Sequence, residues 1–459
     1  MLLYRYRRIE SALLEIDSGT FHFASREELN DPIEGYVRVY WEGDKAAWEG
    51  LFRNYICSVC LTLQWFLLGA DEERIRHRSV MVDRHKFDGV PYGELLHTLG
   101  EEFVLDDDIQ KICTFYGDNK LKVYEKELVS IFRMMHAKAF SLCVRKYKEQ
   151  GLLPEDMELG LREKQESEAV RIFTEGLKTL ANEKDREVLM KVLADFYEDT
   201  MNWSIIQFGI NAKMDLYGKA DTKEEELRRR NWIMLVTDYP MLYVAQLKEL
   251  IYPEAYIVCF SKVANNSAMW GNYANNHKGI CLIYEAGDGI QIEMPSGNKG
   301  IVQARKVEYG GELIERNFFE TLGRCTIPQV KDWLTGTEGV SSCFQVFAEE
   351  QKWRDGYWAV FVAKNYRKIK AWAHEEEYRM VIDNTFYEYT DAQSRNLRYD
   401  TSRLKGIIFG INTSEYDKKQ IVELLIKKSM VDENFEFYQA EYDEEKQVIT
   451  NRKIRAWGL

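Results

Sequence analysis

Two glutamates separated by a single residue are the strongest candidates for chemistry in this sequence. Glu375 and Glu377 stand at the entrance to a strand predicted over residues 378–382, and residues two apart on a strand project from the same face. Two carboxylates held close together raise the pKa of one of them, which makes the pair a candidate catalytic site. The alternative is a surface ladder in which Arg379, on the same face, pairs with Glu377 and neutralises it.

The segment from Ser261 to His277 is a second candidate, because it combines rings with hydrogen-bonding side chains. Trp270, Tyr273 and His277 occur around an asparagine-rich loop, and such groups suit stacking on a planar ring and bonding its edge. The structural alternative is that Trp270 and Tyr273 fix a short helix in the core, while His277 caps the turn before Gly279. For Trp270 the structural role is favoured.

An arginine and a turn near the N-terminus complete the polar candidates. Arg5 and Tyr6 lie in a short apolar strand, where a buried guanidinium needs a partner; Glu377 is one candidate for that partner. The segment Asn30-Asp31-Pro32-x-Glu34 reads as a turn, since proline biases the residue before it toward an extended backbone. A structural role is favoured there over a place at the rim of a pocket.

The eight cysteines predict neither a disulfide framework nor a metal site. They are scattered along a large chain, and only Cys57 and Cys60 have the spacing of a redox or zinc pair. No second pair follows at zinc spacing, and residues 51–66 form an apolar helical stripe. Both cysteines are therefore predicted to be buried in a helix.

Composition and charge disfavour several classes of protein. The chain has 459 residues, of which 45% are hydrophobic, so it can bury sizeable cores. Its net charge of −13 disfavours a broad nucleic-acid surface, and the arginines at 228–230 follow glutamates at 224–226 at a spacing that pairs them along a helix. No apolar run reaches the ~18 residues of a membrane helix, and no signal peptide is evident. A cytoplasmic protein without membrane contact is expected.

The elements that would position the candidate residues are of two kinds. Strand patterns occur near the N-terminus at 2–6 and 21–25, and then from residue 255 onward, at 256–260, 279–284, 301–309, 378–382, 404–411 and 435–440. Residues 44–250 instead carry long helical periods with few breakers. The sequence thus predicts an α+β fold in which residues 1–43 and 255–459 form one discontinuous core domain. Residues 44–254 would form an all-α insertion.

Four stretches, taken together and in order, carry a family resemblance. They are Tyr4-Arg5-Tyr6; Phe23-x-Ser25 followed by Asn30-Asp31-Pro32-x-Glu34; Cys259-Phe260-Ser261 followed by Met269-Trp270, Tyr273-Ala274, His277 and Gly279-Ile280-Cys281; and Trp372-x-x-Glu375-x-Glu377-Tyr378-Arg379. This set resembles the bacterial domain-of-unknown-function family numbered 2971. The long helical middle lies outside the resemblance.

The layout is also similar to the ADP-ribosyltransferase fold, a split β-sheet core with an Arg or His on the first strand, a small hydroxyl residue on the next and a Glu on a later one. Arg5, Ser25 and Glu377 occupy those places here, whereas many relatives have His where this chain has Arg5. The resemblance implies an enzyme that uses NAD, a small-molecule dinucleotide, and passes ADP-ribose to a macromolecular acceptor or hydrolyses NAD. It also implies a toxin or effector role in bacterial defence against phage.

The resemblance assigns roles to the candidate residues. Cleavage of the nicotinamide–ribose bond builds positive charge on the ribose, as glycoside cleavage does, and a carboxylate can stabilise that charge. Glu377 is expected to be this catalytic residue, with Glu375 beside it serving the acceptor, as in arginine-modifying transferases. The residues expected to bind NAD are Arg5, Tyr6, Ser25, Tyr273 and His277.

Two alternatives to this enzyme stay open. In the first, the fold has lost catalysis and the protein is a binding or sensor protein whose helical insertion recognises a protein or nucleic-acid partner. The second is a metal-dependent nuclease, for which the sequence offers no Asp/Glu/His cluster with a nearby Lys. Convergence of Arg5, Ser25 and Glu377 in one cleft would favour the enzyme over the sensor.

Overall fold

The computed structural model describes residues 1–31, 33–69, 80–153, 234–389 and 391–454, with residues 171, 174–176 and 188 between them. Part of the helical stretch predicted over residues 44–250, including the charge clusters at 224–226 and 228–230, lies outside the described residues. Among the helices in these ranges, none combines the length and the hydropathy that crossing a bilayer requires.

The chain divides into two compact units, each discontinuous in sequence. The α+β unit comprises Met1–Val37, Pro253–Ile314 and Trp358–Leu459, and the helical unit comprises Arg38–Tyr252 and Glu315–Tyr357. Residues 315–357 thus belong with the helices, although the sequence analysis assigned them to the α+β core. The physical reason is aromatic packing: the ring of Phe319 lies 5.6 Å from that of Trp48, edge to face.

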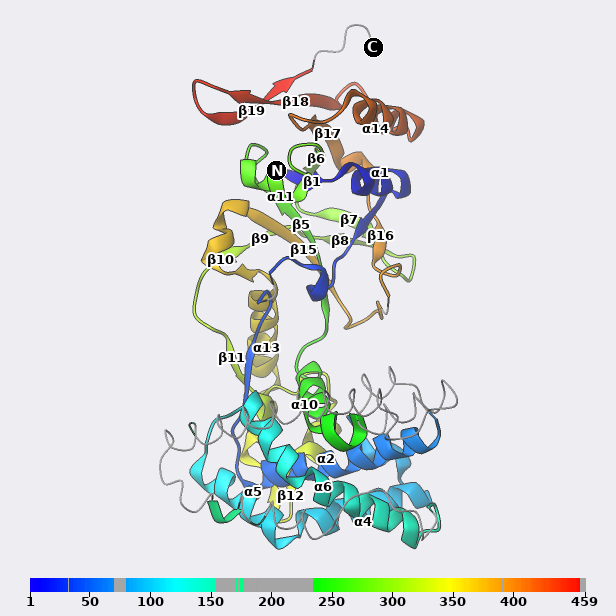
Figure 1. Ribbon diagram of the computed structural model, residues 1–459, viewed down its shortest axis with the longest axis vertical. Helices are drawn as coiled ribbons and strands as arrows, with labels where there is room; N and C mark the ends of the chain where they lie inside the picture. The colour runs from blue at the N-terminus through cyan, green and yellow to red at the C-terminus, as the bar shows by residue number, and fades with distance from the viewer. Residues whose placement is uncertain are drawn as a thin grey trace, which may run out of the picture. The chain divides into compact units, whose positions relative to one another are not determined.

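An eight-stranded sheet forms the centre of the α+β unit, in the order β19-β18-β17-β6-β1-β5-β15-β9. Its strands are β1 (Leu2–Arg7), β5 (Ala255–Ser261), β6 (Ile280–Glu285), β9 (Arg305–Lys306), β15 (Glu377–Asp383), β17 (Leu404–Phe409), β18 (Glu436–Asp443) and β19 (Val448–Lys453). Neighbouring strands are antiparallel except β17 and β18, which are parallel. In Figure 1 the blue β1 lies beside the green β5 and β6. The first strand of the chain is therefore central to a sheet built from its second half.

Smaller strand pairs and short helices surround this sheet. The pairs are β2 (Thr20–His22) with β16 (Asn396–Arg398), β7 (Ile290–Glu293) with β8 (Lys299–Val302), and β10 (Glu308–Tyr309) with β14 (Arg367–Lys368). The helices are α1 (Ile9–Ser18), α11 (Ser267–Tyr273) and α14 (Glu415–Lys427), and the 3₁₀ turns are η1 (Arg26–Glu28), η6 (Lys370–Glu375) and η7 (Thr401–Arg403). Residues of α1 and α14 join the apolar cluster on one face of the sheet, and residues of α11 join the cluster on the other.

The sheet is almost divided between β1 and β5. β1 pairs with β6 along its whole length and β5 does the same with β15, but β1 meets β5 only where Tyr4 faces Ser261. Beyond that pair the two strands no longer share ladder hydrogen bonds. Arg5 partly bridges the opening, because its Nη1 donates to the carbonyl oxygen of Cys259 at 3.1 Å. We call this opening the split.

The helical unit is built on α2 (Lys45–Leu67), whose N-cap residue Asp44 accepts a hydrogen bond from the amide of Ala47. The other helices are α4 (Pro91–Val104), α5 (Asp107–Asn119), α6 (Glu125–Glu149), α10 (Tyr239–Glu249), α12 (Ile327–Trp333) and the first part of α13 (Glu350–Asn365). Short strands and turns connect them: β3 (Arg38–Trp41), β4 (Val123–Tyr124), β11 (Glu315–Asn317), β12 (Thr335–Gly336), β13 (Gly339–Val340), η2 (Arg84–Phe87), η3 (Met234–Asp238), η4 (Phe318–Glu320) and η5 (Ser342–Ala348). Cys57 and Cys60 are buried on α2, as predicted.

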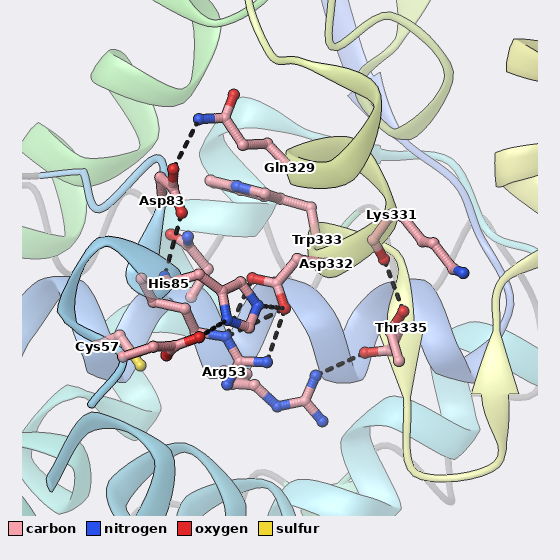
Figure 2. Close-up of polar contacts among 12 residues, drawn as sticks. Arg53, Cys57, Asp83, His85, Gln329, Lys331, Asp332, Trp333 and Thr335 are labelled. Atoms are coloured by element: carbon pink, nitrogen blue, oxygen red, sulfur yellow. Dashed lines mark hydrogen bonds and ion pairs between the residues drawn. The ribbon is translucent and has the colours of Figure 1, made fainter. Parts of the chain in front are cut away.

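An ion-pair cluster joins η2 to α12 in the helical unit. Asp332 accepts hydrogen bonds from Nε and Nη2 of Arg84, at 2.7 to 3.1 Å, and its Oδ1 lies 3.2 Å from Nε2 of His85. Figure 2 shows Asp332 and His85 side by side in this cluster. The other ring nitrogen of His85, Nδ1, lies 2.9 Å from Oδ2 of Asp88. Because a carboxylate meets each nitrogen, the pKa of His85 is raised, first by the hydrogen bond with Asp88.

We expect this cluster to lose stability as the pH rises through the pKa of His85. The pKa of His85 in the folded state lies above its unfolded value. The contribution of protonated His85 to the free energy of unfolding is therefore complete below about pH 6.5 and is lost as the pH rises through the folded-state pKa. The side chain is 54% exposed, which limits the effect to about 0.2–1 kcal/mol. Urea unfolding of wild type and His85→Gln between pH 5.5 and 8.5 measures it. The wild-type advantage should vanish at the alkaline end, and an advantage independent of pH would contradict the assignment.

Candidate functional site

A pocket of about 260 Å³ opens at the split of the sheet. Its walls come from β1, β5, α11, η1 and the start of β15. Five of the seven residues predicted to form a site line it: Arg5, Tyr6, Tyr273, Glu375 and Glu377. Ser25 and His277 are not among the described residues that line it. Side chains far apart in the sequence therefore meet in one place, which we call the split pocket.

Three buried glutamates surround a lysine beside this pocket. Nζ of Lys368 lies 2.7 Å from Oε2 of Glu375, 3.2 Å from Oε2 of Glu377 and 3.7 Å from Oε2 of Glu34. No side chain of the four is more than 4% exposed. Although burial lowers the pKa of Lys368, Glu377 and Glu375 together raise it above its usual value. This arrangement of carboxylates around a lysine was not predicted from the sequence. It differs from the metal-binding cluster of a nuclease, because no group of three or more His, Cys, Asp or Glu side chains among the described residues is placed to hold a metal ion.

A fully buried arginine offsets part of the remaining negative charge. Arg379 donates from Nε and Nη2 to the two oxygens of Glu377, at 2.8 and 2.9 Å, and it also pairs with Glu34. Burial raises the pKa of Glu377 to about 6, against the lowering effect of Lys368. The pairing considered as an alternative from the sequence, Arg379 with Glu377, is thus present. We call Glu34, Lys368, Glu375, Glu377 and Arg379 the charged cluster; with every member ionised it carries one net negative charge.

Glu375 is the member of the cluster that faces the aromatic wall of the pocket. Its Oε1 accepts a hydrogen bond from the hydroxyl of Tyr273 at 2.6 Å, and that hydroxyl accepts one from Nδ2 of Asn30 at 2.8 Å. Burial, and then the contact with Glu375, raise the pKa of Tyr273, so the phenol remains a donor. Among the described residues each oxygen of Glu375 has one partner, whereas both oxygens of Glu377 are held by Arg379 and one also by Lys368. Glu375 therefore keeps more capacity to accept a hydrogen bond from a ligand.

The two glutamates reach the same lysine by a turn and not by strand alternation. Glu375 ends η6, Glu376 has the left-handed φ of 44°, and β15 begins at Glu377. A non-glycine residue in that region is uncommon and needs support from its surroundings. The hydroxyl of Ser261 donates to the carbonyl oxygen of Glu375 at 2.8 Å, and the amide of Lys262 donates to that of Glu376 at 2.9 Å. β5 thus holds the turn that presents both carboxylates.

The partner of Arg5 is Glu15 and not Glu377, the candidate named from the sequence. Nε of Arg5 lies 3.1 Å from Oε2 of Glu15, which also receives Arg7 at 2.9 Å. Strand alternation is the reason. Arg5 shares a face with Leu3, a member of the apolar cluster under α1, whereas Glu377 lies at odd spacing from Met380 of that cluster and projects from the other face.

Ser25 and His277 lie at turns of the backbone, and their side chains make contacts within the protein. Ser25 is the N-cap of η1 and forms a capping box with Glu28. His277 has a φ of 65° in a left-handed turn, and its ring stacks on Trp270 with centroids 6.3 Å apart. Burial lowers the pKa of His277. Trp270 is fully buried, as the sequence favoured.

Lys368 is the member of the site that the sequence analysis missed. It lies in the two-residue strand β14, which has no periodic pattern of its own. A usable signal was present nonetheless: two buried carboxylates and one arginine leave uncompensated negative charge, which requires a further cation within reach. Lys368 stands seven residues before Glu375 and meets that requirement.

Comparison with known proteins gives a match to a protein family. No curated protein and no solved structure matches the chain significantly. The model described as "Protein of unknown function (DUF2971)" matches residues 269–380, a segment that runs from α11 to β15 and contains Tyr273, Lys368 and both site glutamates. Over residues 269–380, the part that supplies most of the charged cluster, this chain resembles the DUF2971 family.

Proposed function

We propose that the split pocket binds the nicotinamide–ribose end of NAD and that the protein is an ADP-ribosyltransferase-like enzyme. The reaction would pass ADP-ribose to a macromolecular acceptor or to water. The observation that carries this proposal is convergence: Arg5 and Tyr6 of β1, Tyr273 of α11 and the two glutamates before and at the start of β15 line one pocket. A sheet that divides between its central strands supports the split core expected from the resemblance.

The pocket suits the part of the dinucleotide where the bond breaks. Its volume of about 260 Å³ lies just under the ~300–1,000 Å³ of sites that enclose a drug-sized ligand. It therefore fits one nucleoside-sized portion and not the whole dinucleotide. Tyr273 places an aromatic ring beside polar groups in the lining of the pocket, which suits a planar amide-bearing ring.

The charged cluster supplies what cleavage of an N-glycosidic bond requires. Positive charge develops on the ribose as the bond breaks, and a carboxylate already fixed in a water-poor site stabilises it without reorganising. Lys368 and Tyr273 fix Glu375 in that role. Glu377 is held by Arg379 and in turn holds Lys368, so we assign it the task of positioning the lysine. This assignment moves the main catalytic role from Glu377, where the sequence placed it, to Glu375.

The test is to incubate the purified full-length chain with NAD, to follow nicotinamide release by chromatography, and to titrate NAD calorimetrically. We expect saturable binding and release of nicotinamide, faster when a lysate supplies acceptors. Tyr273→Phe should weaken both, because it removes the donor to Glu375 while keeping the ring. Absence of NAD binding at millimolar concentration would rule the proposal out.

A binding or sensor protein is the second candidate, and one observation favours it. Both oxygens of Glu377 are engaged by cations that are at most 4% exposed, as in a permanent structural ion pair. In that case the chain would bind NAD or a related nucleoside without consuming it. The role in defence against phage, which the resemblance implies, stays a prediction.

A further inference from the structure

A second hollow, of about 330 Å³, lies on the face of the central sheet that carries α11. Ile283 of β6 and Ile408 of β17 line it and belong to the apolar cluster of that face. Tyr4 of β1 and Tyr438 of β18 also line it and pack against the same cluster. We call it the β18 hollow. Among the described residues that line the two cavities, only Tyr4 is common to this hollow and the split pocket, and no role in NAD binding or catalysis was assigned to Tyr4.

The helix α11 covers this face of the sheet only in part. Its Trp270 is fully buried and meets the ring of Tyr6 edge to face, with centroids 5.1 Å apart. Further along β1, at the β18 hollow, Tyr4 is half-buried and Leu2 is 42% exposed. In the described part of the chain, strands and one turn line the hollow, and no helix does. Apolar surface left open beside a covered region indicates a place where a further segment docks.

The charged side chains that line the β18 hollow have partners within the protein. Glu436 pairs with Lys453 of β19 and accepts a hydrogen bond from the hydroxyl of Tyr438 at 2.6 Å. Glu285 lies 3.9 Å from Nζ of Lys405. The hollow therefore needs an apolar cover more than it needs a counter-ion.

Strand β19 brings the chain to the rim of the β18 hollow. The amide of Ile454, the residue after β19, donates to the carbonyl oxygen of Phe437 in β18 at 2.8 Å. The two neighbours of Phe437 along β18, Glu436 and Tyr438, both line the hollow. The residues that follow Ile454 therefore begin beside it.

The side chains of β19 alternate between the two faces of the sheet. Ile449 belongs to the apolar cluster on the face of α11, and Asn451 lines the hollow. Residues 455–459, with the sequence Arg-Ala-Trp-Gly-Leu, follow and lie outside the described residues. Position 457 is an even number of residues from 449 and 451, so the same alternation assigns Trp457 to the side of the hollow.

We propose that residues 455–459 of the same chain dock over the β18 hollow and that the indole of Trp457 fills it. Three residues span up to ~10 Å when extended, and β17 lies two strands, or ~10 Å, from β19. Trp457 therefore reaches the hollow without disturbing β19. A large ring with one N–H suits a site that joins aliphatic side chains and two tyrosine rings to a polar rim. This docking goes beyond the proposed function and does not depend on it.

The test is to replace Trp457 in the full-length chain by the photoreactive amino acid p-benzoylphenylalanine, to irradiate a dilute solution and to map the cross-links by peptide mass spectrometry. We expect cross-links to β17, β6 or β1, the strands that line the hollow beyond β18. Leu2→Glu places a charge in the lining of the hollow and should lower the yield of these cross-links at least threefold. Leu14→Glu is the matched control, because Leu14 is 72% exposed and lies on α1, away from the hollow.

The position of the cross-links decides the proposal. Cross-links confined to β18 and β19, which the covalent connection alone brings within reach, would overturn it, and so would cross-links between two copies of the chain. A yield that Leu2→Glu and Leu14→Glu lower equally would also contradict docking in the hollow. The map of the labelled chain without further substitutions stands even if Leu2→Glu fails to fold. Nicotinamide release is measured separately, so neither result depends on the other.

Discussion

Replacing Arg379 by methionine is expected to lower the free energy of unfolding of the α+β unit by about 3–5 kcal/mol. The side chain is fully buried and makes the two-pronged ion pair with Glu377. Without it the charged cluster changes from one net negative charge to two, in a setting where an unpaired charge costs far more than in water. Urea unfolding followed by circular dichroism, with hydrogen exchange of the β15 amides to identify the unit, measures the loss.

The matched control for Arg379→Met is Lys453→Met. Lys453 also pairs with a glutamate, Glu436, but both side chains are at least 40% exposed, so its removal should cost at most about 1 kcal/mol. The deficit of Arg379→Met should also shrink as the pH falls toward 5, because protonation of a cluster carboxylate removes the excess negative charge. If Arg379→Met is as stable as Lys453→Met, water must reach the charged cluster and solvate the carboxylate that Arg379 leaves unpaired.

Replacing Glu375 by glutamine is expected to reduce the rate of nicotinamide release a hundred- to thousandfold, or about 2.7–4 kcal/mol of barrier. The amide keeps the shape and one acceptor but removes the charge that meets the developing cation. Stability should change little, since the cluster then holds two carboxylates and two cations and becomes neutral. Single-turnover kinetics at saturating NAD, with calorimetric Kd values, separate the loss in rate from any loss in binding.

Glu377→Gln is the companion variant, and it should behave differently. It breaks the pair with Arg379, so we expect a clear loss of stability together with a smaller fall in rate. The reverse pattern, with Glu377→Gln stable and inactive and Glu375→Gln active, would return the catalytic role to Glu377. If wild-type protein binds NAD without releasing nicotinamide, the sensor candidate replaces the enzyme.

Much of the fold could be predicted from local pattern. The apolar runs predicted at 256–260 and 404–411 correspond to β5 and β17, and the run at 378–382 lies within β15. The position of residues 315–357 could not be predicted, because their short strands and turns have little periodicity and their place depends on tertiary contacts. One such contact is made where Gly50 of α2 leaves room for the backbone of Trp333; a Cβ there would lie 1.9 Å from its carbonyl oxygen.

The candidate site was predictable only in part, both in its residues and in its pairings. The types and spacing of Glu375, Glu377 and Arg379 identified the charged face in advance. The partner of Arg5 depended on which face of β1 the helix α1 would cover, and the sequence leaves that open. Lys368 was missed because a lone lysine in a two-residue strand has no local signature; only the sum of buried charge indicates it.

The central place of β1 has a consequence for synthesis of the chain. β1 ends at Arg7, but its neighbours β5 and β6 are complete only at Ser261 and Glu285. At ~5–20 residues per second, a ribosome takes roughly 15–55 s to make the intervening chain. During that time the first strand has no sheet to join, and its pairing is among the most non-local in the molecule, a type of contact that slows folding. The split pocket can therefore form only after most of the chain has been made, so an incomplete product carries no site.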